Sequence, residues 1–308
     1  MTFAEVESAR KAYHEKIKQE WTVFGVIAGI AAIIYLVTGG LSSPLSLFGL
    51  LFILFFFGTF YLIISYFLNR KVATAYKETY KSYFVARNLS LIFSDLRYDH
   101  TLGLSEAVLR STGMINTGDV YHSNDFASGR YKDVAFSQAD VHIQEEHTDS
   151  DGNTTYVTIF RGKFMIFEFP KKFSFKLELV GKKFHAYRVP GKNPATGRKM
   201  QKISTESGEF NKSFRIFAED GFEAFYLLDP AFMIKIQDIS SAHDYKNIFC
   251  FIENRLIIGL NDGKDSFEPP KATKSLDEAV ENAKIASDIK TITDFVDQLS
   301  LNRKLFSK

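Results

Sequence analysis

Residues 21–40 read WTVFGVIAGIAAIIYLVTGG, and residues 45–68 read LSLFGLLFILFFFGTFYLIISYFL. Neither run contains a Lys, Arg, Asp or Glu. A helix rises about 1.5 Å per residue, so about 20 residues cross a hydrocarbon core of about 30 Å. That core offers backbone groups no water, which leaves helices as the structure that satisfies them. The sequence therefore predicts a transmembrane helical hairpin over residues 21–68, with a tight turn at residues 41–44.

Charges on the flanks of this hairpin give its expected orientation. The basic residues nearest to the two runs are Arg10, Lys11, Lys16, Lys18, Arg70, Lys71, Lys77, Lys81 and Arg87. Basic residues accumulate on the cytoplasmic side of a membrane, so both termini are expected in the cytoplasm and the uncharged turn outside. A cleaved signal peptide is not expected, because a polar segment of mixed charge precedes the first run and the run is too long.

Composition fits this placement. The chain has 308 residues, one cysteine and a formal net charge of +2. So balanced a charge does not indicate a nucleic-acid partner. Cys250 lies inside the apolar run 248–252, which favours a small core residue over a disulfide or a catalytic thiol and fits a reducing compartment. Residues 69–308 are enough for one large domain or two small ones.

The rest of the chain divides by the period of its apolar residues. Residues 1–20 have the spacing of an amphipathic helix, and residues 69–95 continue the second run as a connecting helix. Residues 96–272 are dominated by alternation and by β-branched or aromatic residues, and residues 273–308 carry a long amphipathic helix. The expected fold class is α+β, with an N-terminal two-helix transmembrane hairpin followed by a cytosolic β-rich domain with flanking helices.

Turn formers and helix caps locate the expected elements of the cytosolic domain. The expected strands are 133–144, 155–169, 173–180, 213–218, 247–252 and 255–260. The first two are expected to pair as a hairpin, and the last two as a second hairpin. A short helix is expected after Ser105 as N-cap, and another over residues 230–239, with Asp229 as N-cap and Pro230 as its first residue.

Small residues inside the hairpin are candidates for helix packing. Gly25 and Gly29 are four residues apart in the first run, and the second run contains Gly49 and Gly58. Small residues at this spacing allow two helices to approach closely. Packing between the two spans of one chain is the expected use, and a homo-oligomer through the same surface is the alternative.

The run HIQEEHTDSDGN at residues 142–153 collects potential metal ligands. Asp149, Asp151 and Asn153 match the first three donors of a calcium loop, but Thr154 and Phe160 occupy the positions of its Gly and Glu. A zinc site would need a third nitrogen or sulfur ligand nearby. A solvated hairpin tip is therefore expected here.

Catalytic motifs are equally absent from the sequence. The loop GKNPATGRK at residues 191–199 has five residues between its glycines where a phosphate-binding loop has four, and Arg follows where Lys is required. No Gly-x-Ser-x-Gly motif occurs. We therefore expect no catalytic residue, no metal, no cofactor and no enzymatic activity.

Basic side chains gather in the segment 182–202, which contains no acidic residue. They are Lys182, Lys183, Arg188, Lys192, Arg198, Lys199 and Lys202. Each basic side chain near an anionic leaflet contributes about 1 kcal/mol of attraction. The segment is either a site that docks on acidic lipid head groups or a partner, or a solvated loop, and the sequence favours the two equally.

Several short blocks occur in a familiar order. They are YHSNDFASG at 121–129, FS at 136–137, FRGKFMIFEF at 160–169, AFYLLDPAFM at 224–233 and RLIIGL at 255–260. Together with the hairpin anchor, they resemble the DUF3137 family of bacterial membrane proteins, a family of unknown function. Gln138 departs from the Ser-Glu pair typical of the family. The resemblance implies an anchored cytosolic domain at the bacterial inner membrane, and a partner of the LemA type, whose genes often lie beside those of the family.

Three function classes remain open from the sequence. The first is a membrane-anchored cytosolic scaffold or sensor that binds a protein partner at the inner face of the membrane. The second is an anionic-lipid-binding module that uses the basic segment 182–202. The third is a membrane-tethered enzyme with scattered catalytic residues. The first is favoured, because interaction surfaces are plentiful and catalytic groupings are not.

Overall fold

The computed structural model describes residues 1–37, 44–170, 172–193 and 196–299. The chain divides into two compact units. Unit 1 comprises Met1–Val85 and Glu268–Asn282, and unit 2 comprises Ala86–Phe267 and Ala283–Lys308.

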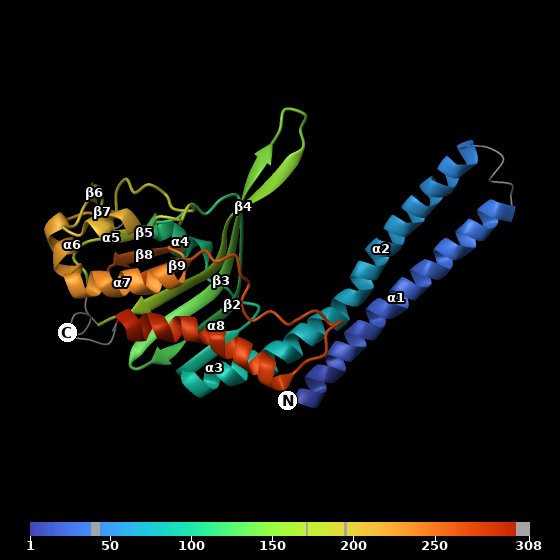
Figure 1. The fold of residues 1–308 in the computed structure, drawn as a ribbon, viewed down its shortest axis with the longest axis horizontal. Helices are drawn as coiled ribbons and strands as arrows, with labels where there is room; N and C mark the ends of the chain where they lie inside the picture. The colour runs from blue at the N-terminus through green and yellow to red at the C-terminus, as the bar shows by residue number, and fades with distance from the viewer. Residues whose placement is uncertain (38–43, 171, 194–195, 300–308) are drawn as a thin grey trace. The chain divides into compact units, whose positions relative to one another are not determined.

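Figure 1 shows the helices and strands along the chain. The helices are α1 (Phe3–Val37), α2 (Pro44–Tyr80), the π-helical η2 (Lys81–Ala86), α3 (Arg87–Ile92), α4 (Glu106–Thr112), α5 (Gly208–Ser213), α6 (Gly221–Leu227), α7 (Pro230–Ala242) and α8 (Glu278–Leu299). The strands are β1 (Ser94–Asp99), β2 (Val120–Tyr131), β3 (Val134–Thr148), β4 (Thr154–Glu168), β5 (Leu177–Gly181), β6 (Gln201–Ile203), β7 (Phe214–Ala218), β8 (Asn247–Ile252) and β9 (Arg255–Leu260). The α+β class expected from the sequence is confirmed.

Helix α1 joins two segments that the sequence treats separately. The amphipathic stretch 1–20 and the first apolar run form one helix, since no Gly or Pro interrupts the chain where they meet. Among the described residues, α1 is the one helix that is long and apolar enough to cross a membrane. The expected turn at 41–44 lies, except for Pro44, outside the described residues, and α2 begins at Pro44.

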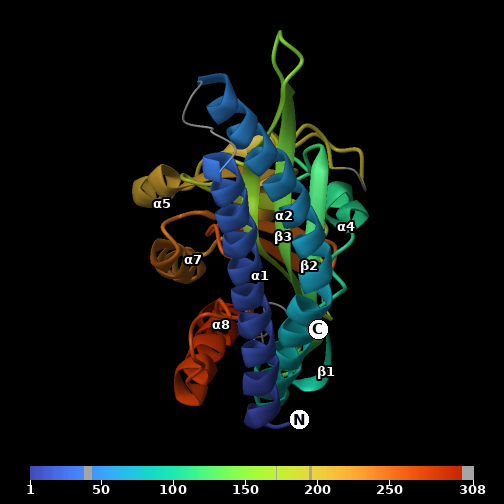
Figure 2. The same ribbon diagram turned by 90° about the vertical axis from the view of Figure 1, so that its right-hand side faces the viewer.

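The two long helices of unit 1 lie side by side (Figures 1 and 2). The Tyr61 hydroxyl donates a hydrogen bond of 2.9 Å to the carbonyl oxygen of Glu20. The Glu20 carboxylate accepts hydrogen bonds from Ser65 and Asn69. These bonds lie near the polar end of the apolar runs, where they fix the register of α2 against α1.

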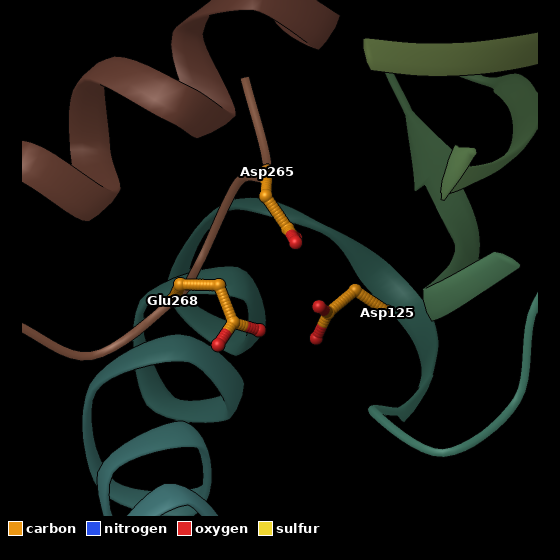
Figure 3. A group of neighbouring side chains, drawn as sticks. All are labelled: Asp125, Asp265 and Glu268. Atoms are coloured by element: carbon orange, nitrogen blue, oxygen red, sulfur yellow. The ribbon is translucent and has the colours of Figure 1, made fainter. Parts of the chain in front are cut away.

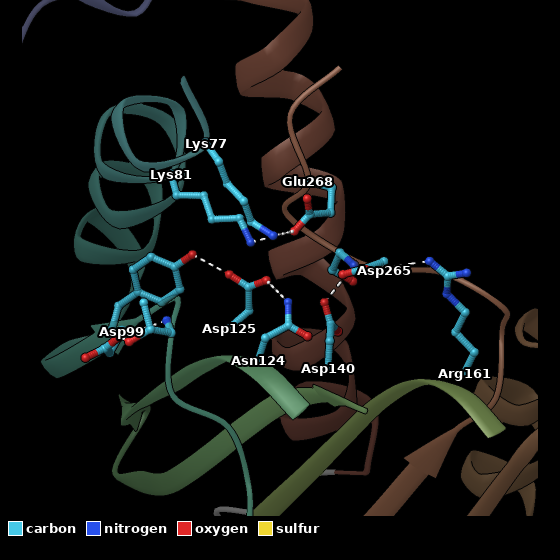
Figure 4. A network of polar contacts seen from close by, with 12 residues as sticks. Lys77, Lys81, Asp99, Asn124, Asp125, Asp140, Arg161, Asp265 and Glu268 are labelled. Atoms are coloured by element: carbon cyan, nitrogen blue, oxygen red, sulfur yellow. Dashed lines mark hydrogen bonds and ion pairs between the residues drawn. The ribbon is translucent and has the colours of Figure 1, made fainter. Parts of the chain in front are cut away.

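The segment 268–282 packs on these helices and completes unit 1. The Glu268 carboxylate lies 2.7 Å from Lys81 Nζ and 2.8 Å from Lys77 Nζ (Figure 4). The Tyr76 hydroxyl donates to the carbonyl oxygen of Pro270 at 3.1 Å, and the Tyr80 hydroxyl to the Glu281 carboxylate at 2.5 Å. Burial of the Lys81 side chain is possible because its charge has this partner.

Unit 2 is built on a nine-stranded antiparallel sheet with the order β1-β2-β3-β4-β9-β8-β5-β7-β6. The predicted hairpins are both present: β3 pairs with β4, and β8 with β9. Asp149 shapes the tip of the first hairpin, where its carboxylate accepts hydrogen bonds from the backbone N–H groups of Asp151 and Asn153. The tip is exposed, as the density of turn formers predicts.

Both faces of the central strands are covered. Alternate residues of a strand point to opposite faces, so Phe249 and Phe251 of β8 share one face. Phe251 packs against Phe232 of α7, and Phe249 against Phe295 of α8, each with ring centroids 6.1 Å apart. Cys250 points to the opposite face, where it is buried in the core as predicted.

That second face carries the main apolar cluster of unit 2. Leu109 of α4 and Phe184 of the β5–β6 connection join Phe160 and Phe164 of β4 there. Phe160 and Phe164 stack with ring centroids 4.7 Å apart. Ser105 caps α4 as predicted, since its hydroxyl accepts a hydrogen bond from the N–H of Ala107 at 3.3 Å. The sheet is therefore the middle layer of three.

The N-terminal part of the sheet differs from the sequence-based expectation. The helical stretch that follows the second apolar run ends at Ile92, and β1 begins at Ser94, within the expected connecting helix 69–95. The strands β1 and β2, the short strand β6 and the helices α5 and α6 were not expected. The other elements lie within a few residues of their predicted bounds.

Candidate functional site

Two consecutive capped helices, α6 and α7, form one surface of unit 2. The Asp220 carboxylate accepts hydrogen bonds from the N–H groups of Phe222 and Glu223, which starts α6. The Asp229 carboxylate accepts a 2.7 Å bond from the N–H of Phe232, which starts α7 as the sequence predicts. A carboxylate at each start also complements the partial positive charge of a helix N-terminus.

Three aromatic side chains project from α6 into solvent. Phe222, Phe225 and Tyr226 are 81%, 46% and 74% exposed. Their spacing places them on one side of the helix, while Ala224 and Leu227 face the core. Single exposed apolar residues such as Phe222 are ordinary on a protein surface, whereas Phe225 and Tyr226 are adjacent and together present a larger apolar patch.

A groove of about 770 Å³ lies beside these aromatics. One wall is the segment 204–206, and the other is formed by Phe225 and Tyr226, with Leu228 and Met233 adding apolar surface. We call this the α6–α7 groove. Its volume falls within the range of about 300–1,000 Å³ that is typical of binding pockets.

Unit 2 also contains a group of carboxylates beside β2 and β3. Asp125 is fully buried at a bulge in β2, where its φ is 56°. A carboxylate oxygen of Asp125 and one of Asp265 lie within 4.8 Å of each other (Figure 3). Asp140 of β3 lies beside them, and its carboxylate accepts a 2.6 Å hydrogen bond from the N–H of Ser266 (Figure 4).

Protein donors already satisfy much of this group. The Asp125 carboxylate accepts hydrogen bonds from the Tyr98 hydroxyl at 2.7 Å and from the Asn124 amide at 2.8 Å (Figure 4). Arg161 Nη2 lies 3.6 Å from the Asp265 carboxylate. Oxygen atoms of this kind are ligands for hard cations, but these ones bind the chain itself. The group therefore anchors the segment after β9 onto the sheet.

Burial raises the pKa of Asp140 to about 7. Loss of water is the largest cause, and the nearby Asp125 and Asp265 carboxylates raise the pKa of Asp140 further. The Lys163 ammonium group and the Ser266 N–H act in the opposite direction. Asp140 is therefore a carboxyl group that changes its charge near neutral pH.

The structure separates the seven basic residues of the segment 182–202. Lys183 Nζ lies 2.5 Å from the Asp244 carboxylate, and Lys182 Nζ lies 4.8 Å from the Tyr245 ring centroid, both beyond the C-terminal end of β5. Asn193 and Thr196 lie at the other end of β5, where they donate hydrogen bonds to the Glu219 carboxylate. β5 has five residues, so its two ends are about 13–17 Å apart along the strand direction.

All seven basic side chains are exposed, but they do not form one continuous patch. The positive charge of the segment is divided between the two ends of β5. Lys192, Arg198, Lys199 and Lys202 lie near one end, and Lys182 and Lys183 lie near the other. Arg188 lies between, where its N–H donates to the carbonyl oxygen of Met114.

The candidate packing glycines of unit 1 have different surroundings. A Cβ added to Gly58 would lie 3.3 Å from the Phe24 ring, so α1 and α2 approach closely at that point. Among the described residues, a Cβ added to Gly25, Gly29 or Gly49 would meet no atom within 4 Å. Of the four candidate glycines, Gly58 is therefore the one at which α1 and α2 approach closely in the described part of the chain.

The C-terminal part of the chain matches a known protein family. Residues 158–301 match the family described as "Protein of unknown function (DUF3137)". The match confirms the resemblance seen in the sequence, and it covers β4 to α8, including the α6–α7 groove.

The other comparisons assign no function to the chain. No curated protein matches the chain. Among solved structures, the crystal structure of the mycobacterial trehalose monomycolate transport factor A, TtfA, is similar over 72% of this chain and 93% of that chain, with 10% identity and a TM-score of 0.37. A likeness at this level carries no argument about function.

Sequence reasoning missed the α6–α7 groove. Phe225 and Tyr226 stand in the block that carries the family resemblance, but nothing local shows that they are exposed. The groove depends on the segment 204–206, which lies some 20 positions earlier in the chain. The one available signal was the Asp-Gly-Phe-Glu sequence at 220–223, whose Asp220 marks a helix start.

Proposed function

We propose that this protein is a membrane-anchored scaffold or sensor whose unit 2 binds a protein partner at the inner face of the membrane. The observation that carries the proposal is the α6–α7 groove with its exposed aromatics. Aromatic side chains are enriched where proteins bind one another, since they bury a large area at a small cost in conformational freedom.

The anchor in this proposal is a hairpin of two spans, α1 and the apolar part of α2. Support comes from the uncharged run 45–68 and from its exposed apolar side chains, among them Phe52, Phe55 and Phe60. Exposed side chains of this size are unfavourable in water and favourable in lipid. Basic flanks on both sides of the pair support cytoplasmic termini.

Purification of the full chain from cross-linked membranes, followed by mass spectrometry, tests the proposal. A partner that is recovered reproducibly with wild type, at a ratio near one to one, is expected. The control is a chain with residues 1–85 alone, which carries the anchor but lacks unit 2. A partner that both chains recover equally, or no partner after cross-linking, contradicts the proposal. The implied LemA-type membrane protein is one candidate for that partner.

Binding of anionic lipid is a second candidate function, favoured by the exposure of all seven basic residues in 182–202. Their division between the two ends of β5 weakens it, because attraction to a flat surface falls off within about 8 Å at physiological salt. Liposome flotation separates the two candidates. With the full chain held in nanodiscs, charge reversal at Arg198 and Lys199 abolishes its preference for anionic over uncharged vesicles if the segment binds lipid, and leaves its vesicle binding unchanged if the segment is only solvated.

A further inference from the structure

We infer that the α6–α7 groove binds an amphipathic helix with Lys and Arg on its polar face, contributed by the partner protein. This inference rests on the proposed function and names the chemistry of the partner. Its basis is the lining of the groove, the aromatic anchors on one wall and the sign of the charged lining residues.

The lining of the groove favours a helix. The α6–α7 wall consists of side chains, since the backbone groups of these helices are paired within each helix or by its cap. A partner strand therefore finds no free backbone edge on that wall. An amphipathic helix needs what the wall offers, which is apolar side chains spaced to meet anchors at every third or fourth position.

The apolar surface extends past the groove itself. A smaller adjoining pocket shares Tyr226 and is lined by Phe173, Phe175 and Leu227. Tyr226 therefore stands between two depressions, at 74% exposure. A partner helix that straddles Tyr226 covers the side chain and fills both depressions.

Charge complementarity sets the sign of the partner. Glu206 on one wall and Asp229 on the other are the charged side chains that line the groove, and neither has a basic neighbour among its lining residues. The adjoining pocket adds Glu223 and one basic residue, Lys172. Among the described residues that line the two depressions, three are acidic (Glu206, Asp229 and Glu223) and one is basic (Lys172), which favours a cationic partner over an anionic membrane surface.

The test uses the full chain in nanodiscs of uncharged phosphatidylcholine. The probe is a fluorescent synthetic helix with Leu and Phe on one face and Lys and Arg on the other. Two control probes have the same composition in scrambled order, or Glu in place of every Lys and Arg. We expect the cationic amphipathic probe to bind at least tenfold more tightly than either control.

Variants of the chain locate the binding. The double variant F225A/Y226A should weaken binding about tenfold or more, because both anchors are lost. F222A is the matched control, since Phe222 lies on the same helix, is more exposed and does not line the groove. It should change affinity less than twofold. E206Q/D229N should weaken binding severalfold and flatten its salt dependence, while Asn at 229 still caps α7.

Three results would overturn the inference: equal binding of the scrambled probe, equal binding of the acidic probe, or an F222A effect as large as that of F225A/Y226A. Direct binding of the full chain in these nanodiscs to anionic vesicles, if lost in F225A/Y226A, would point to lipid, and self-association lost in F225A/Y226A would point to a second copy. Both also overturn it. A cross-linked partner that F225A/Y226A still recovers would contradict the groove as its binding site but not the proposed scaffold function. Recovery of no partner at all would contradict the scaffold function itself.

Discussion

The Asp140 carboxyl group is buried beside the carboxylates of Asp125 and Asp265. Its pKa is about 7 in the folded chain and about 3.8 when the side chain is solvated. Between these values the folded state binds a proton that the unfolded state has lost. Stability from this group is therefore present below about pH 4 and is lost as the pH rises to about 7.

Substitution of Asp140 by Asn should remove this pH dependence. The amide keeps an oxygen for the Ser266 N–H and never carries a charge. At pH 8 the variant should be more stable than wild type, by at most about 4 kcal/mol at about 1.4 kcal/mol per pKa unit. At pH 4 the two should be equal. Urea unfolding of the full chain in detergent, followed by near-ultraviolet circular dichroism, measures both values.

The control for Asp140 is Asp151→Asn at the exposed hairpin tip, which should leave the pH profile of unfolding unchanged. Parallel profiles for wild type and D140N would show that Asp140 is ionised throughout, contrary to the expectation.

A buried ion pair gives a second test with single residues. Lys176 Nζ lies 2.5 Å from Glu178 Oε1 and also donates to the carbonyl oxygen of Thr112, and both charged side chains are fully buried. Burial raises the pKa of Glu178, and Lys176 opposes that rise. Lys176→Met should cost about 3–5 kcal/mol in the free energy of unfolding at pH 7, since it leaves a charge without its partner.

The paired variant K176M/E178L distinguishes this explanation from lost packing. It should recover most of the loss, because two apolar side chains of similar volume replace the pair. If the double variant is as unstable as K176M, the cost comes from packing around β5 and not from the stranded carboxylate.

At the scale of elements, the junction of β4 and β9 depends on a residue without a side chain. A Cβ on Gly162 would lie 2.0 Å from the carbonyl oxygen of Leu260, a backbone atom that cannot swing away, and the φ of Gly162 is 156°. Gly162→Ala should therefore destabilise the sheet by about 3 kcal/mol or more, measured by urea unfolding. Gly208→Ala, where a Cβ meets no atom within 4 Å, should change stability by less than about 1 kcal/mol. Equal effects at the two positions would show that β4 and β9 can separate at little cost.

The elements that the sequence predicts are those whose signal is local. The β8–β9 hairpin and the helix after Asp229 follow from alternation, turn residues and a cap, and the structure has them at or near the predicted bounds. Strand β2 was missed because the bulge at Asp125 breaks its alternation and because it is polar on one face. Alternation is the signal of a regular, half-buried strand, and a bulge removes it.

The candidate site shows the same limit at the scale of tertiary structure. Each basic residue in 182–202 is exposed as expected, but only the path of the chain around β5 shows that they separate into two groups. The α6–α7 groove needs the segment 204–206 beside two helices that follow it, which no local pattern reports. Distance along the sequence is a poor guide to distance in space wherever a sheet intervenes.

At the scale of the whole molecule, the proposed anchor and the proposed binding groove belong to one chain, so the anchor would set where binding occurs. Attachment to a membrane confines unit 2 to a thin layer, which raises its effective concentration toward partners in the same membrane. A modest affinity in the α6–α7 groove is then sufficient for a lasting complex with a membrane protein. This advantage exists only if unit 2 and the partner segment are on the same side of the bilayer.

The side of the bilayer can be measured by single-cysteine labelling. Cys250 is fully buried and burial raises the pKa of its thiol, so the native cysteine should stay unreactive in the folded chain. In intact spheroplasts, a membrane-impermeant maleimide should label Ser43→Cys, between the two apolar runs. It should label Ser8→Cys and Ser150→Cys only after the membrane is permeabilised. Labelling of Ser150→Cys in intact spheroplasts would place unit 2 outside, and protection of all three positions in intact spheroplasts would exclude a hairpin of two spans.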